Sequence, residues 1–289
     1  MNRWVVGARP RTLPAAVVPV LVGTAAAVGV PDADVVWWRA LAALVVALAI
    51  QVATNYVNDF ADGERGTDDH RVGPVRLVSS GLATSREVKL AALGSAAVAA
   101  VAGAALAVAV GPELLVVGVC CFVAGYLYTG GPRPYGYAGL GEVFVFVFFG
   151  LVATVGSAYV HLERVSGLAV AAAIPVGLLA TALLVINNLR DIPTDVVAGK
   201  VTLAVRLGDR DTRSLYAALV IGTFVSAVAV APVRSGALAA LLAIPLAVAP
   251  VRAVLAGATG PRLIPVLGAT GRVQLVAGTL LAAGIALTR

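Results

Sequence analysis

The sequence predicts an all-α, polytopic membrane protein with about nine transmembrane helices. Of its 289 residues, 60% are hydrophobic and 12% are charged, and the mean hydropathy is +0.96. A soluble domain has about 45–50% apolar and about 25% charged residues, so this composition excludes one, and it also excludes a polar, disordered chain. The apolar residues form blocks of about 17–22 positions, long enough to cross a hydrocarbon core about 30 Å thick.

Breaks at proline, glycine and charge clusters divide these blocks into nine spans. An odd number of spans places the two termini on opposite sides of the membrane. Three arginines precede the first span, which Pro14 and Pro19 interrupt, and we interpret it as a retained helix rather than a cleaved signal peptide. The predicted spans are 13–30, 36–57, 87–110, 113–130, 139–160, 167–186, 214–231, 236–255 and 272–288.

The basic residues indicate the orientation of the bundle. When the connections are assigned alternately to two faces, all 21 Lys and Arg residues except Arg39, Arg164, Arg234 and Arg289 fall on the N-terminal face. The positive-inside bias makes that face cytoplasmic. The net charge of +6 is therefore explained by the membrane topology of the chain. We expect the protein to associate with a lipid bilayer and not with nucleic acid.

A first polar cluster, Asn55–Asp69, follows the second span on the predicted cytoplasmic face. If the helix continues through it, Asn55 pairs with Asp59 and Asn58 pairs with Asp62 at i,i+4 spacing, each pair on one helix face. A solvated helix end would explain one such cluster.

A second cluster, Asn187–Asp195, follows the sixth span on the same face, with Asn187, Asp191 and Asp195 at successive i,i+4 steps. Carboxylates gathered in the low dielectric near a membrane repel strongly, so we expect a cation between the two clusters. Oxygen ligands from Asp and Asn select a hard ion, and Mg²⁺ typically binds one or two carboxylates plus substrate phosphates. The alternative is a pair of solvated helix ends.

Basic residues accompany both clusters, as a diphosphate site requires. Arg71 and Arg76 follow the first cluster and Lys200 follows the second, although each is also explained as a topology charge. Arg133 lies in a loop rich in glycine, proline and tyrosine that begins at Tyr128. This loop suits an aromatic substrate or, alternatively, a tight turn at the membrane interface.

These motifs resemble those of the UbiA-type intramembrane aromatic prenyltransferases, and most closely the branch that prenylates 1,4-dihydroxy-2-naphthoate in menaquinone biosynthesis. The resemblance extends from residue 8 to about residue 208. In much of the superfamily the first motif ends in a further aspartate, whose position falls here on Gly66, and Asp68 or Asp69 takes its place. The segments that carry the resemblance are Ala8–Pro14, Asn55–Asp69, Tyr128–Pro132, Gly139–Glu142 and Asn187–Leu203.

The resemblance implies one domain, residues 1–289, with a two-half bundle (spans 2–5 and 6–9) around a central cavity in the cell inner membrane. It implies Mg²⁺-dependent transfer of a polyprenyl group from polyprenyl diphosphate to an aromatic acid, with loss of diphosphate and CO₂, giving demethylmenaquinone. Residue patterns and resemblance together assign catalysis to Asp62, Asp191, Lys200 and Arg76, metal binding to Asn58, Asp62, Asp68, Asp69, Asp191 and Asp195, and substrate binding to Asn58, Arg71, Arg133, Tyr128, Asn187, Asn188 and Arg190.

Two alternatives stay open at this point. The same fold and chemistry could serve another acceptor, such as 4-hydroxybenzoate or homogentisate. An ion-coupled transporter would also contain duplicated halves and proline-interrupted helices, but it predicts ionisable residues at the bilayer midplane, whereas the acids here fall at span ends. The sequence leaves the oligomeric state open.

Overall fold

The computed structural model describes residues 2–31, 33–67, 73 and 75–288. In this part of the chain the regular structure is entirely helical. Three residues with predicted roles, Asp68, Asp69 and Arg71, lie outside the described residues.

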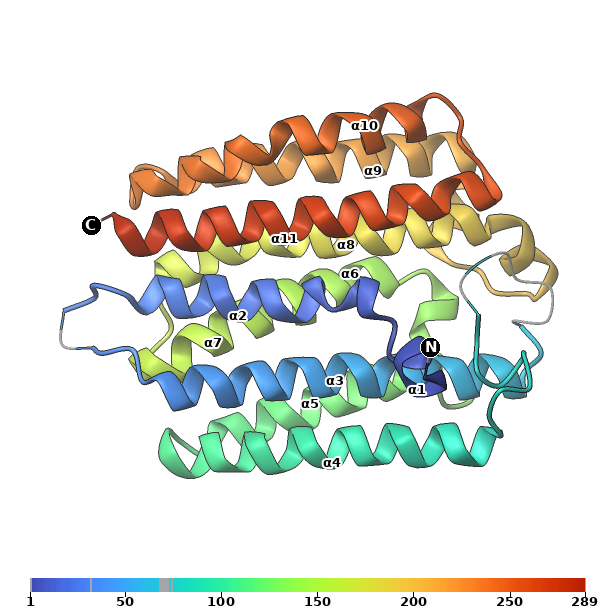
Figure 1. Cartoon of the computed structure of the whole chain (residues 1–289), viewed down its shortest axis with the longest axis horizontal. Helices are drawn as coiled ribbons and strands as arrows, with labels where there is room; N and C mark the ends of the chain where they lie inside the picture. The colour runs from blue at the N-terminus through green and yellow to red at the C-terminus, as the bar shows by residue number, and fades with distance from the viewer. Residues whose placement is uncertain (1, 32, 68–72, 74, 289) are drawn as a thin grey trace.

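The helices lie side by side along one common direction, and the chain termini lie toward opposite ends of the bundle (Figure 1). The connections α3–α4, α5–α6 and α8–α9 share the end near which the chain begins. The elements are α1 Arg3–Ala8, η1 Pro10–Thr12, α2 Pro14–Ala27, α3 Trp37–Glu64, α4 Ser85–Ala109, α5 Glu113–Leu127, η2 Tyr135–Ala138, α6 Gly141–Val145, η3 Phe146–Val152, α7 Ala153–Leu162, α8 Gly167–Val197, α9 Leu203–Val230, η4 Ser235–Ala243, α10 Ile244–Leu255, η5 Gly260–Arg262 and α11 Leu263–Leu287.

Seven helical segments of the described chain are long and apolar enough to cross a membrane. The segments Arg3–Thr12 and Pro14–Ala27 meet at a bend of 51° and make an eighth if they are counted as one span. Helix α5 is apolar but has only 15 residues. The chain is thus a multi-pass membrane protein, while nine crossings stay a prediction, although each of the nine predicted spans overlaps a helix.

Four helices extend well beyond their predicted ends, and the first of them, α3, continues to Glu64 instead of stopping at residue 57. Helix α8 continues to Val197 instead of stopping at residue 186, α9 begins at Leu203 instead of 214, and α11 begins at Leu263 instead of 272. Hydropathy ends a span where charges begin, but the polar turns at the end of α8 are helical because their side chains find partners inside the bundle. The expected long loop 187–213 is therefore mostly helix.

Helix α8 is the central element and packs against α9, α11, α2 and η3. The segment η3 is a π-helical turn that joins α6 to α7, a feature that often marks functional sites. Here η3 approaches α8 closely, since a Cβ atom on Gly150 would lie 2.5 Å from the Cα atom of Gly177. Only glycine permits this contact, and it places the η3 phenylalanines beside the middle of the bundle.

The outer helices expose large apolar side chains. Val101 and Val108 on α4, Val116 on α5 and Leu242 on η4 are all exposed. A surface of this kind is suited to lipid rather than to water. The predicted membrane environment thus agrees with the way the helices pack.

Candidate active site

Asp59 and Asp62 of the first cluster contact different partners. Asp59 accepts hydrogen bonds from the backbone N–H groups of Leu77 and Val78, at 2.9 and 3.0 Å. Asp59 therefore anchors the connection that follows α3. One turn away, the carboxylate of Asp62 is left to face the basic residues of the site.

Asp62 lies at the centre of the candidate site and is only 2% exposed. Its Oδ1 accepts a hydrogen bond of 2.7 Å from the hydroxyl of Tyr137. Its Oδ2 lies 4.0 Å from Nη2 of Arg76 and 4.0 Å from Nζ of Lys200. The structure therefore brings together three residues that the sequence predicted to be catalytic.

Lys200 connects the two acidic motifs. Its Nζ lies 4.0 Å from Oδ1 of Asp195 as well as 4.0 Å from Asp62. The connection between α8 and α9 supplies this geometry, because the N–H of Lys200 donates to the backbone carbonyl of Asp195 at 2.8 Å. Thr202 caps the N-terminus of α9, and its hydroxyl also lies 3.5 Å from Oδ2 of Asp195.

The second motif carries its own cation. Nε and Nη2 of Arg190 donate to the two carboxylate oxygens of Asp191, at 2.7 and 2.8 Å. Nη2 also donates to Oδ1 of Asn187 at 2.8 Å. Within the described part of the chain, Nη1 of Arg190 is buried without a hydrogen-bond partner. One side of this guanidinium is thus available to an anion.

The connection between α5 and α6 packs over the first motif. The hydroxyl of Thr129 donates to Oδ1 of Asn58 at 2.8 Å. Arg65, at the end of α3, donates to the backbone carbonyls of Thr129 and Gly131. These contacts hold the loop that carries Tyr137 in place above Asp62.

Tyr137 is surrounded by charge. The guanidinium of Arg65 and the ammonium of Lys200 lie 5.4 and 5.0 Å from the centre of its ring. Burial, and next the negative charge of Asp62, raise the pKa of the Tyr137 hydroxyl. The phenol therefore stays protonated at neutral pH and acts as the hydrogen-bond donor to Asp62.

A buried hydrogen bond between two polar side chains joins α6 to α8. Nδ2 of Asn188 donates to Oε1 of Glu142 at 2.9 Å, and both side chains are buried. Within the described residues, Oε2 of Glu142 has no hydrogen-bond partner. Asn188 thus positions α8 against α6, and its predicted contact with substrate stays a prediction.

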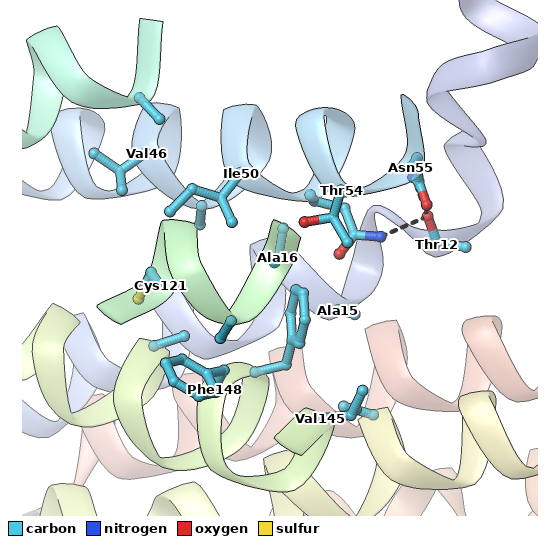
Figure 2. A pocket seen from close by; sticks show the side chains of 18 of the residues that line it. Thr12, Ala15, Ala16, Val46, Ile50, Thr54, Asn55, Cys121, Val145 and Phe148 are labelled. Atoms are coloured by element: carbon cyan, nitrogen blue, oxygen red, sulfur yellow. Dashed lines mark hydrogen bonds between the residues drawn. The ribbon is translucent and has the colours of Figure 1, made fainter. Parts of the chain in front are cut away.

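An apolar cavity of about 890 Å³ lies between the helices next to these groups. Its walls come mainly from α3, α4, α5, η3, α7 and α8, and Figure 2 shows side chains of α3 facing Phe148 across it. Of the predicted site residues, Arg76, Tyr128 and Asn187 line it. Arg76 therefore borders the cavity and faces Asp62 at once, which connects the cavity to the acidic site.

Arg133, which the sequence assigned to substrate binding, lies away from the cavity. Arg133 is exposed and does not line the cavity, so the aromatic loop contributes Tyr137 to the site instead. The sequence did not assign a role to Tyr137, Arg65, Thr129, Thr202 or Glu142. The tyrosine-rich loop was the available signal for Tyr137, and the other four lie within the segments that carry the family resemblance.

The donor atoms of the site are suited to a hard metal ion. Asp62 and Asp195 already share a cation in Lys200, and carboxylate and amide oxygens are the ligands that Mg²⁺ prefers. Among the described residues, however, no group of three or more acidic, histidine or cysteine side chains is close enough to hold a metal. The residues fit such an ion chemically, with substrate phosphate oxygens completing its shell.

Several curated proteins that are similar to this chain bear the same name. A 1,4-dihydroxy-2-naphthoate octaprenyltransferase of Mycobacterium leprae is 50% identical over 98% of this chain and 97% of its own length. The protein of that name from Mycobacterium tuberculosis is also 50% identical, over 98% and 97%. The Escherichia coli protein is 39% identical over 77% and 74%.

Solved structures with the same fold are more distant in sequence. A UbiA homolog from Archaeoglobus fulgidus bound to GPP and Mg²⁺ superposes with a TM-score of 0.65 at 16% identity, over 98% of this chain and 100% of that one. An apo UbiA homolog from Aeropyrum pernix gives a TM-score of 0.71 at 17% identity, over 94% and 96%. The sequence matches the UbiA prenyltransferase family over residues 16–262. The chain belongs to the UbiA prenyltransferase family.

Proposed function

We propose that this protein transfers a polyprenyl group from polyprenyl diphosphate to 1,4-dihydroxy-2-naphthoate, releasing diphosphate and CO₂ and giving demethylmenaquinone. The observation that carries the proposal is the meeting of Asp62 and Asp195 at Lys200, beside an apolar cavity that Arg76 also lines. Relatives that are 50% identical over 98% of the chain bear the name of this activity.

The diphosphate end of the donor binds between the two motifs. Lys200, Arg76 and Arg190 supply positive charge beside the aspartates. Mg²⁺, when bound by carboxylates of both motifs, neutralises charge on the diphosphate, and an A. fulgidus UbiA homolog was solved with Mg²⁺ and GPP. Asp68, Asp69 and Arg71 belong to this proposed site by sequence alone.

The residues of this chain assist departure of the leaving group. As the C–O bond of the donor breaks, negative charge grows on the diphosphate and an allylic cation forms. Lys200 and Arg76 are held where they stabilise that growing negative charge, and in many enzymes preorganised charge in a site without water contributes most of the rate enhancement. The ring carbon of the acceptor then forms the new C–C bond, and its carboxyl group leaves as CO₂.

The cavity excludes water from these steps. Its walls are mainly apolar, including Ile50, Val145 and Phe148, as Figure 2 shows. An apolar environment accommodates the prenyl chain and protects the cation from reaction with water. The acidic site lies at the end of the bundle on which the basic residues concentrate, and the proposal makes this end cytoplasmic.

The proposal includes one catalytic domain over residues 1–289, in which spans 2–5 and 6–9 each contribute one aspartate motif. Helices α3 and α8, which carry the motifs, belong to different halves of the chain. The bilayer in question is the cell inner membrane.

Product analysis tests the function. Purified protein is incubated with Mg²⁺, one polyprenyl diphosphate and, in separate reactions, 1,4-dihydroxy-2-naphthoate, 4-hydroxybenzoate and homogentisate. We expect a product of demethylmenaquinone mass in the first reaction only, and loss of it when EDTA is added. Prenylation of another acid in preference to the naphthoate would overturn the assigned acceptor.

A further inference from the structure

A polar patch interrupts the apolar wall of the cavity where α2 begins. The hydroxyl of Thr12 accepts hydrogen bonds from Nε2 of Gln51 at 2.9 Å and from Nδ2 of Asn55 at 3.1 Å. The same hydroxyl donates to the carbonyl of Arg9 at 2.9 Å. Gln51 and Asn55 are 7% and 4% exposed, so a buried hydrogen-bond network fixes the patch. Figure 2 shows part of this network at the edge of the cavity.

Two arginines border this patch, and both line the cavity. Arg9 has φ of 52° and donates to the backbone carbonyl of Asn55 at 3.3 Å. A left-handed backbone at a residue other than glycine is strained, and such strain concentrates at functional sites. The guanidinium of Arg11 forms no hydrogen bond or ion pair with any residue that the structure describes. Arg11 therefore presents an open, positively charged group at the cavity mouth.

The opposite wall is aromatic. Tyr135 and Phe144 stack with ring centres 3.9 Å apart, and Phe144 and Phe148 are nearly parallel with centres 6.0 Å apart. Tyr128 meets Tyr135 edge to face at 5.6 Å. All four rings line the cavity. Together they provide flat apolar surfaces on which another aromatic ring can stack.

The position along α3 relates the patch to the acidic site. Asn55 precedes Asn58 by three residues and Asp62 by seven, which corresponds to about 4.5 and about 10 Å of helix rise. An aromatic ring held near Asn55 therefore lies about two helical turns along α3 from the place where Asp62 would hold the diphosphate of the donor. A prenyl chain placed against this patch would cover the guanidinium of Arg11 without offering it a hydrogen-bond partner, at a cost in free energy.

We propose that this patch is the acceptor subsite: the aromatic acid stacks on the Phe144–Phe148 wall, and its carboxylate binds Arg11 with support from Arg9. The inference rests on the proposed function and adds the residues that bind the acceptor. It moves the recognition of the acid from Arg133 to the start of α2. The prenyl chain then occupies the rest of the cavity, toward Leu106 and Leu114.

Binding without donor tests this subsite. The affinity of 1-hydroxy-2-naphthoate for purified protein is measured by equilibrium dialysis in detergent. We expect Arg11→Gln to weaken binding by about 10- to 100-fold, as expected for loss of a charge-assisted hydrogen bond. Arg210→Gln, an exposed arginine of α9 outside the cavity, is the matched control and should bind as the parent does.

Two further measurements make the result specific. 1-Naphthol, which has the same rings without the carboxylate, should bind the parent and Arg11→Gln equally well. The KM for polyprenyl diphosphate in Arg11→Gln should stay within about threefold of the parent, while the KM for the aromatic acid rises. Unchanged binding of the acid, or a rise in the KM for the diphosphate instead, would overturn the proposal.

Modification of the unmutated protein provides a test if Arg11→Gln does not fold. Phenylglyoxal modifies accessible arginines, and 1-hydroxy-2-naphthoate should protect Arg11 but not Arg210. Equal labelling of Arg11 with and without the acid would contradict the proposal. A protein that binds the acid through Arg11 but makes no demethylmenaquinone would refute the proposed function and leave the subsite intact.

Discussion

At the end of the bundle where the chain finishes, Arg39 and Arg234 are held by backbone carbonyl groups, whereas at the opposite end Lys200, Arg76 and Arg190 lie against aspartates. Arg39 donates to two backbone carbonyls, at 2.9 and 3.1 Å, and Arg234 also donates to two. Lys200 lies 4.0 Å from Asp62 and 4.0 Å from Asp195, beyond hydrogen-bond distance from either.

This difference in partners distinguishes basic residues that stabilise the fold from basic residues that can bind substrate. A guanidinium that caps backbone carbonyls connects helices, and removing it leaves buried acceptors without partners. A cation between two carboxylates at longer range retains donors for a phosphate oxygen. The end of the bundle at which a basic residue lies reflects membrane topology. The groups that the residue contacts indicate whether its role is structural or functional.

The largest effects should come from the aspartates of either motif. Asp62→Asn and Asp191→Asn should each lower kcat by about 10³-fold, because each removes a negative charge from a site that holds cations and diphosphate together. Turnover by protein purified from membranes measures this, with melting temperature as the folding control. Near-normal turnover in either variant would remove that motif from the site.

Loss of the basic residues of the site should have the next largest effect. Lys200→Ala and Arg76→Ala should each lower kcat by at least ~10²-fold, as removal of one charge-stabilising donor does in other enzymes. Arg210→Ala, an exposed basic residue at the same end, is the control and should retain activity. If all three variants behaved alike, these cations would not hold diphosphate.

A smaller effect is expected at Tyr137. Tyr137→Phe removes one hydrogen bond to a carboxylate, which is worth about 1.5–3 kcal/mol, so the rate should fall by about 10- to 100-fold. Burial and the charge of Asp62 raise the pKa of this hydroxyl, so it does not ionise below its ordinary pKa near 10. The pH–rate profiles of parent and variant should therefore be parallel from pH 6 to about pH 9. A step present only in the parent would show that Tyr137 titrates.

The opposite end should show the reverse pattern, with the smallest effect on rate. Arg39→Ala leaves two carbonyls unpaired and breaks the 3.0 Å ion pair with Glu163. We expect a loss of about 2–4 kcal/mol in the free energy of unfolding, seen as a lower melting temperature. At a temperature where the variant is folded, kcat should stay within about threefold of the parent. A large loss of kcat in folded Arg39→Ala would contradict a purely structural role for Arg39.

Hydropathy predicted the fold class and the approximate place of each helix, since long apolar blocks in a membrane protein can form little else. It placed the end of α8 eleven residues too early, at residue 186 rather than Val197. Asn188, Arg190 and Asp191 are buried and bonded there, and even Pro193 lies within the helix. A window average cannot distinguish polar residues that have buried partners from those that face water.

The acidic half of the site was predictable because aspartates at i,i+4 spacing on one face already indicate a cation. The loop that covers it was not, since contacts such as Tyr137 with Asp62 join residues 75 positions apart. The sequence assigned Arg133 of this loop to substrate binding, and that assignment stays a prediction. In the structure Arg133 is exposed, and Tyr137 of the same loop contacts Asp62.

The central claim is that the two motifs form one site, and a double-mutant cycle on kcat tests it directly. Asp62→Asn, Asp195→Asn and the double variant are compared with the parent under saturating substrates. Residues that act as a unit are strongly non-additive, so the double variant should be about as slow as the slower single variant. Rate losses that multiply, as they do for independent sites, would contradict the claim that both carboxylates serve one diphosphate site.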